Sequence, residues 1–341
     1  MYYISQDNVV SLLDGLRHQY EVLVPVKKDE QRFYRKYAGG ALEGMVLGEV
    51  RAFEPLKAFF FLAREKVAEG FEAAPPRTRA KPLCIVGVKA CDLKGFKVQD
   101  HVFGGEECAD PFYQRARDEN LILAADCTCA IDTCFCLAVD VKPHPEADFD
   151  INLSAVNGGF VVAVGSDKGQ AVVDDHPALF EQAGEELVRA RDEQRARVRA
   201  EVEANIAEHA VPHQDRFEGI IERSADDLWA DEAQTCVECG ACNTVCPTCH
   251  CFLLYDQEDA GRMARLRLWD SCMIKDFARV AGGANPRERL WMRLRNRFEK
   301  KFDFFPKVAG IYACTGCGRC VSACPAKIDI RKVLGRLVSD A

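Results

Sequence analysis

The sequence lacks the segments that would place a protein in or across a membrane. No apolar run approaches the roughly 20 residues that a membrane-spanning helix needs. The opening residues, MYYISQDNVV, lack the basic segment and the apolar stretch of a signal peptide. A G-x-G-x-x-G turn between a strand and a helix is also missing, as is a Walker A sequence. We therefore expect a cytoplasmic protein without a nucleotide or flavin site of its own.

Cysteine, in contrast, is abundant. The chain of 341 residues has 18 cysteines, and most of them fall into short clusters. In a large chain that is not exported, cysteines at short spacings are typical of metal or redox sites. Because metals bind the thiolate form of cysteine, we expect the protein to work in a reducing, anaerobic cell interior. A hydrophobic content of 48% is sufficient for a sizeable core.

The order of the segments predicts an α+β fold. Residues 83–90 (LCIVGVKA) and 120–127 (NLILAADC) are short apolar runs that suit buried strands. A helix is expected from about Pro111 between them, which suggests a βαβ-like unit. Asn157-Gly158-Gly159 separates two further apolar runs and predicts a β-hairpin. Residues 54–72 suggest an amphipathic helix.

We expect three parts in the chain. Residues 1–175 would form a mixed α/β domain with the β-hairpin and a further iron–sulfur site, and residues 176–214 a helical connector. Residues 215–341 would form an α-helical ferredoxin domain with two [4Fe–4S] clusters. This last part includes a segment from Arg262 to Lys307 with thirteen Lys and Arg against five Asp and Glu, so it carries +8 while the rest of the chain carries −16. The segment is either a solvated helical surface or a docking face for an acidic partner.

Two motifs carry the strongest signal. Each has three cysteines spaced by two residues and then a Cys-Pro pair, which is the spacing of a two-cluster ferredoxin. In such proteins the fourth cysteine of each motif binds the other cluster. We therefore assign two sets of ligands: Cys236, Cys239, Cys242 and Cys324 for the first cluster, and Cys314, Cys317, Cys320 and Cys246 for the second. Zinc is a poor alternative because it does not require a duplicated motif of this kind.

The 67 residues between the motifs, 247–313, are long, basic and helix-prone. In this respect the region resembles the helical ferredoxin domain at the C-terminal end of the succinate dehydrogenase iron–sulfur subunit. Two clusters with four thiolates each would transfer electrons and would leave no iron open for a substrate.

A weaker set of cysteines lies upstream. Cys91 and Cys127 follow the two predicted strands, and Cys134 and Cys136 could close a third site. Cys129 competes for one of the four positions. A zinc site or a group of buried, inert thiols would also explain this set. Cys84 and Cys108 are isolated.

Three more cysteines have no evident place. Cys249 and Cys251 follow the first motif, and Cys272 lies in WDSC. They could pack beside a cluster, hold an additional metal, or form a redox-active thiol pair. His250 lies between the first two and is a weak candidate for a metal ligand.

Several of these motifs together resemble one family. GVKACDLKGF, DPFYQRARDENLIL, C-x6-CFC, CxxCGxCxxxCPTCxCF, WDSC and AGGANPRER look like the β subunit of sulfhydrogenase-type NiFe hydrogenases. The sequence is equally similar to the iron–sulfur electron-transfer subunit of anaerobic sulfite reductase and to subunits of flavin oxidoreductase–heterodisulfide reductase complexes. The resemblance covers most of the chain from about residue 80.

The resemblance implies a non-catalytic iron–sulfur subunit of an oxidoreductase complex. It would pass electrons between a partner that binds flavin and NAD(P)H and a catalytic subunit of the hydrogenase, sulfite reductase or heterodisulfide reductase type. Flavin would then be on the partner. Two other hypotheses remain: a redox enzyme with its own flavin or open-iron site in the N-terminal half, and a zinc-stabilised scaffold. No binding to nucleic acid is expected.

Overall fold

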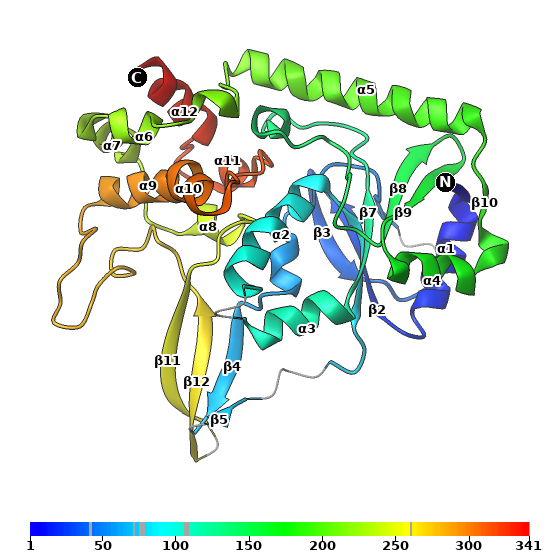
Figure 1. Cartoon of the computed structure of the whole chain (residues 1–341), viewed down its shortest axis with the longest axis horizontal. Helices are drawn as coiled ribbons and strands as arrows, with labels where there is room; N and C mark the ends of the chain where they lie inside the picture. Colours follow the sequence, from blue (N-terminus) through cyan, green and yellow to red (C-terminus); the bar gives the residue numbers. More distant parts are fainter. Residues whose placement is uncertain (41–42, 71, 75–78, 106–108, 260, 341) are drawn as a thin grey trace.

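The computed structural model describes residues 1–341 except 41–42, 71, 75–78, 106–108, 260 and 341. Cys108, one of the two isolated cysteines, is therefore outside the described residues. None of the helices in the described ranges is long and apolar enough to cross a membrane. The fold is mixed, with an N-terminal sheet, a second sheet and a helical C-terminal region (Figure 1).

The larger sheet has eight strands in the order β10-β1-β9-β8-β7-β6-β2-β3. The pairs β2–β6, β6–β7 and β7–β8 are parallel, and the other pairs are antiparallel. The strands are β1 (Tyr2–Ser5), β2 (Glu21–Lys28), β3 (Gln31–Lys36), β6 (Leu83–Val88), β7 (Leu121–Ala125), β8 (Ile151–Val156), β9 (Gly159–Val164) and β10 (Glu181–Gln182).

Helices cover both faces of this sheet. On one face lie α1 (Gln6–Leu16) and α4 (Asp167–Asp175), and on the other α2 (Ala90–Phe103) and α3 (Pro111–Glu119). Every residue of β6 and β7 is buried, as expected for parallel strands between two layers of helices. The predicted βαβ unit and the β8–β9 hairpin, with Gly158 at φ +77°, are confirmed.

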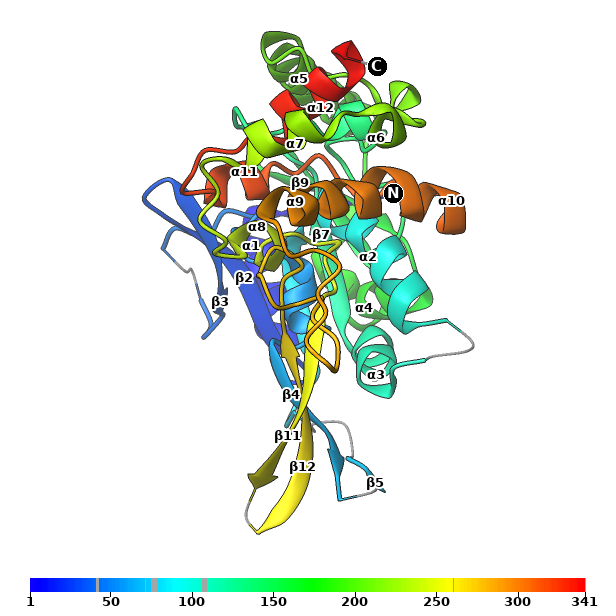
Figure 2. The same ribbon diagram turned by 90° about the vertical axis from the view of Figure 1, so that its left-hand side faces the viewer.

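The smaller sheet corrects two expectations. Residues 54–72 do not form an amphipathic helix: a short 3-10 helix, η1 (Leu56–Phe59), leads into β4 (Arg64–Glu69) and β5 (Glu72–Ala73). The segment between the motifs is not helical throughout, because β11 (Phe252–Asp259) and β12 (Arg262–Trp269) form a hairpin within it. The four strands, in the order β11-β12-β4-β5, form an arm that extends from the body of the molecule (Figure 2).

These segments form paired strands because each can bury its apolar surface only against the other. Leu266 of β12 pairs with Lys66 of β4 and is 7% exposed, whereas most residues of β11 are exposed. The arm thus joins residues 64–73 to residues 252–269, across the expected boundaries at 175 and 214. Those boundaries stay a prediction.

The C-terminal region is built of short helices. The expected connector contains one long helix, α5 (Glu185–Glu208), which runs along the edge of the molecule (Figure 1). The following helices are α6 (Ile220–Arg223), α7 (Asp226–Ala233), α8 (Ala241–Thr244), α9 (Leu290–Glu299), α10 (Phe305–Ala309), α11 (Arg319–Ala323) and α12 (Ile330–Ser339). A π-helical turn, Lys300–Phe304, connects α9 to α10.

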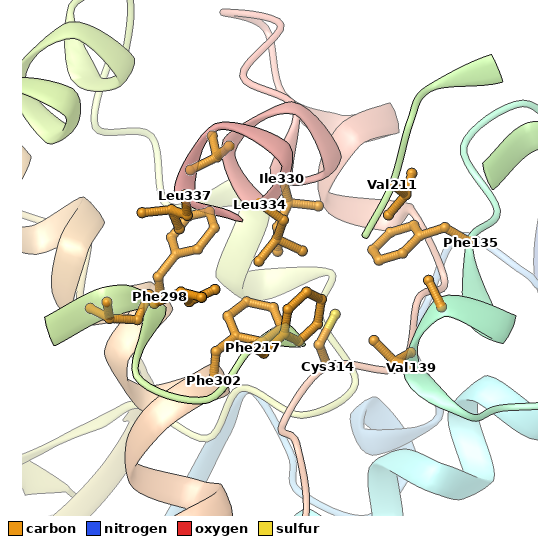
Figure 3. Close-up of a cluster of buried hydrophobic side chains, with 14 of the residues drawn as sticks. Phe135, Val139, Val211, Phe217, Phe298, Phe302, Cys314, Ile330, Leu334 and Leu337 are labelled. Carbon is orange, nitrogen blue, oxygen red and sulfur yellow. The ribbon is translucent and has the colours of Figure 1, made fainter. Parts of the chain in front are cut away.

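One hydrophobic core holds this region against the N-terminal half. Phe217 and Phe302 meet at its centre, with ring centroids 5.2 Å apart. Phe135 and Val139 enter from the loop after β7 (Figure 3), so this core includes residues from the third cysteine set. Cys314 of the second motif lies in the same core, which ties the cysteine loops to the packing of the helices.

Candidate metal centres

The first cysteine set lines one cavity. Cys236 and Cys239 lie on the loop that leads into α8, Cys242 lies in α8 itself, and Cys324 lies at the C-terminal end of α11. Gly240 takes φ +71° at the start of α8, where the loop turns sharply between the second and third cysteines. The four thiols that the motif assigns to one cluster therefore surround one space. Their binding of a cluster stays a prediction.

The second cysteine set is more deeply buried. Burial raises the pKa of Cys314 and that of Cys320, and the nearby Cys246 adds to both increases. Cys317 also raises the pKa of Cys320. Cys246, Cys314 and Cys317 are all buried. Cys246 from the first motif therefore lies near cysteines of the second motif, and the crossed pairing of the ligands stays a prediction.

The third set brings five cysteines together. One cavity is lined by Cys91, Cys127, Cys129, Cys134 and Cys136. Cys91 lies in the first turn of α2, and Cys127 follows β7. All four expected residues and the competitor Cys129 therefore face one space. The arrangement does not select four of the five.

The second set lies between the other two. Cys320 lines the cavity of the first set, and Cys317 lines the cavity of the third set. Gly316 is in contact with the third set as well: a Cβ atom there would be 2.4 Å from the Cα of Cys136, and its φ is +62°. The three sites are therefore neighbours in a row, each sharing a wall with the next.

Buried cations surround the cysteines. Lys301 is 4% exposed, and its Nζ lies 3.3 Å from Sγ of Cys246. Arg297 donates from Nε to Oδ1 of Asn243, and its Nη2 is buried without a partner in the described structure. Other buried cations near the cysteines are Arg51, Lys57, Lys89 and Arg319.

Such cations fit an anionic metal centre. Burying a charge without a partner is costly, and only Arg319 of these six forms a direct ion pair, at 2.7 Å from Asp92, among the residues that the structure describes. A cluster with four thiolate ligands would supply the missing negative charge. The residues present therefore fit iron–sulfur clusters.

Three of these thiols, Cys127, Cys314 and Cys320, are poorly suited to ionise alone. Burial raises the pKa of Cys127 and that of Cys314 to about 12, and the pKa of Cys320 to about 11. A thiol with such a pKa is a weak nucleophile at neutral pH. Metal binding would deprotonate it, so the environment favours a ligand over a catalytic thiol.

The spacing disfavours zinc. Zinc–sulfur bonds of about 2.3 Å bring the ligand sulfurs to within about 4 Å of one another. Among the described residues, no three cysteine sulfurs lie within 4.8 Å of one another. The wider spacing of each set is consistent with a larger centre.

The histidine between Cys249 and Cys251 is a packing residue. The ring of His250 contacts the rings of Phe103 and Phe305, and its Nδ1 lies 3.1 Å from the carbonyl oxygen of Thr248. Burial lowers its pKa to about 4, so the ring is neutral at neutral pH. These contacts favour a structural role over metal binding.

Sequence reasoning found the cysteines but missed most of the buried cations. Arg319 lies between Cys317 and Cys320 in the second motif and is buried. Lys57 and Arg51 are far from any cysteine in sequence. The basic segment 262–307 is not simply a solvated surface, because Arg267, Arg293, Arg297 and Lys301 within it are buried.

Comparison with known proteins agrees with this geometry. Residues 235–328 match the 4Fe-4S dicluster domain family. In an alignment over 308 residues that covers 88% of each chain, the sequence is 31% identical to the sulfhydrogenase 2 subunit beta of Pyrococcus furiosus. The dicluster match supports two [4Fe–4S] clusters in the C-terminal region.

Proposed function

Because the chain belongs to the family of sulfhydrogenase β subunits, we propose that it relays electrons through three [4Fe–4S] clusters in an oxidoreductase complex. One end of the relay would meet a subunit that binds flavin and NAD(P)H, and the other a catalytic subunit. The protein's own residues fix the positions of the clusters and tune their reduction potentials through nearby charge.

The observation that carries the proposal is the row of three thiol sets. Since Cys320 and Cys317 line the cavities on either side of the second set, an electron could move from the third site to the first by two short steps. Electron transfer needs proximity and no bond making. A row of neighbouring centres with complete thiolate ligation suits it better than catalysis.

The third site supports a relay over an open-iron enzyme. Five cysteines face its cavity, which is one more than a cubane needs. An iron left open for a substrate would call for three. We therefore retain the ligand set Cys91, Cys127, Cys134 and Cys136, with Cys129 as a neighbour of the cluster.

In this proposal the first site is the one that faces a partner subunit. Cys239 is exposed, and the neighbouring Val237 is 63% exposed. On the loop between β12 and α9, Lys275, Arg279 and Arg289 are exposed, and none has an ion pair in the described part of the chain. Charge complementarity favours an acidic partner at this surface.

The proposal is tested by iron and sulfide analysis of anaerobically purified protein. We expect about twelve irons per chain, from three clusters of four. Cys127→Ala should reduce this to about eight, while Cys84→Ala, which changes a buried thiol of β6 away from all three sets, should leave it unchanged. Eight irons in the unaltered protein would refute the third cluster, and zinc without iron would refute the relay.

A further inference from the structure

An arginine from outside all the cysteine motifs lies in the wall between the second and third cysteine sets. Arg51 is on the loop between β3 and η1. Its side chain lines the cavity of the third set together with Cys317 of the second set, and it is 6% exposed. Because 266 positions separate Arg51 from Cys317 in the chain, only the fold brings this cation to the wall.

Arg51 donates hydrogen bonds to both cysteine segments. Its Nε donates to the carbonyl oxygen of Cys317. Its Nη2 donates to Oγ1 of Thr133 and to Oγ of Ser322, each at 3.3 Å. Thr133 directly precedes Cys134 of the third set, and Ser322 lies in α11, within the second motif. One guanidinium therefore connects the segments that carry the ligands of two neighbouring sites.

The two segments also contact each other directly. The N–H of Phe135 donates to the carbonyl oxygen of Gly316 at 2.9 Å. Gly318 takes φ +68°, and a Cβ atom there would overlap the carbonyl oxygen of Thr133. The segments thus approach each other as closely as glycine allows, and the hydrogen bonds of Arg51 add to this contact.

Arg51 is itself held in place. Nε of Arg319 donates to the carbonyl oxygen of Ala52 at 2.9 Å. Each arginine therefore binds the backbone beside the other, since Arg51 binds that of Cys317. The two differ in charge balance: Arg319 is paired with Asp92 at 2.7 Å, whereas Arg51 has no ion pair within the part of the chain that the structure describes.

The charge of Arg51 needs a counter-charge. Burying a cation without one is costly, and the three oxygens that accept its hydrogen bonds are neutral. Burial raises the pKa of Cys134, and the charge of Arg51 opposes this rise. An anionic centre at the second or the third site would compensate the cation.

We propose that Arg51 is a positioning residue of the relay, which fixes the separation of the second and third clusters and places one positive charge between them. This role rests on the proposed function, because it requires a cluster at each of the two sites. The planar fork of arginine can hold several acceptors in one geometry, whereas the single ammonium of lysine cannot. The charge would stabilise an electron on either cluster.

Two substitutions separate position from charge. Arg51→Lys keeps the charge and loses the fork, while Arg51→Met loses both. Electron paramagnetic resonance of the fully reduced protein measures the magnetic interaction of neighbouring clusters, which depends on their separation, and a redox titration measures their potentials. We expect a weaker interaction in both variants. Only Arg51→Met should also lower the potentials of two clusters, by the equivalent of about a tenfold change in equilibrium constant, or about 59 mV.

Arg32→Met is the matched control. Arg32 is also buried, but it is paired with Glu49 and lines neither of the two cysteine cavities. Its loss should leave the interaction and the potentials unchanged. An unchanged interaction in both Arg51 variants at full iron content, or an equal change in the control, would overturn the proposal.

A milder variant decides the question if Arg51→Met loses iron. Thr133→Val combined with Ser322→Ala removes the two hydroxyl acceptors and keeps the cation. We expect a weaker interaction at unchanged potentials, and an unchanged interaction would overturn the proposal. Fewer than about twelve irons in the unaltered protein would instead refute the three-cluster relay, so the two failures are distinguishable.

Discussion

The charge of Lys301 should set the reduction potential of one cluster. Its Nζ lies 3.3 Å from Sγ of Cys246, 2.8 Å from Oγ1 of Thr248 and 3.0 Å from the carbonyl oxygen of Ala313. Burial alone would lower the pKa of Lys301, but the nearby sulfurs of Cys246 and Cys249 raise it above its ordinary value. The side chain is therefore charged at neutral pH.

The magnitude follows from the distance. An electron added to the second cluster would spread beyond Cys246, to about 6 Å from Nζ, where a unit charge at an effective dielectric constant of about 20 interacts by roughly 3 kcal/mol. Some of this is recovered by relaxation. Lys301→Met should therefore lower the potential of that cluster by roughly 60–120 mV, since about 59 mV corresponds to a tenfold change for one electron.

The measurement is a redox titration followed by electron paramagnetic resonance. One signal should shift to a lower potential in Lys301→Met, and the others should move less. Ala313 keeps a hydrogen bond from Thr248 at 2.7 Å, so the local fold should survive. Lys300→Met is the matched control, because that lysine is exposed and one residue away. Unchanged potentials at full iron content, or an equal shift in the control, would refute the reasoning.

Three further predictions concern stability. Gly316→Ala should cost about 1–3 kcal/mol more than Gly310→Ala in thermal unfolding, because both positions have positive φ but only the first would press a Cβ against Cys136; equal Tm losses would contradict this. Arg319→Met should lower the free energy of unfolding, measured in urea, by about 3–5 kcal/mol, because it leaves Asp92 buried and unpaired. Adding Asp92→Asn should restore part of this loss. Because burial lowers the pKa of His250 to about 4, the unfolded chain binds a proton first as the pH falls below about 6.5, and stability should decrease from there towards pH 4. His250→Phe, which keeps the contacts with Phe103 and Phe305, should weaken this pH dependence.

The cysteine sets were predictable because their spacing is local. Three ligands of each C-terminal cluster lie within seven residues, so the motif alone indicates which thiols face one site. The third set was also within reach, since Cys91 and Cys127 follow neighbouring parallel strands whose carboxyl ends meet at one edge of the sheet. The sequence could not decide between Cys129 and its neighbours as ligands, because all five thiols face the same cavity.

The arm shows why the predictions for other elements were wrong. Residues 54–72 have an amphipathic pattern that suits a helix, and β12 is rich in arginine. Each becomes a strand because the other provides a partner, nearly 200 residues away in the chain. Buried Arg267 illustrates the cause: it pairs with Glu65 of β4 and with Asp110. A charge that looks solvent-exposed in sequence is thus neutralised by residues that only the fold brings together.

The same reasoning links the clusters to folding. Lys57, Lys89, Arg297 and Lys301 are buried beside cysteine thiols, and among the residues that the structure describes none of the four forms an ion pair with a carboxylate. Protonated thiols would leave these cations without counter-charge at a cost of several kcal/mol each. Binding of a cluster would replace the thiol protons with an anionic centre and so would stabilise the cations and the thiolates together. If the proposed clusters bind here, the same cations would tune electron transfer and would make the fold of this region dependent on its metal.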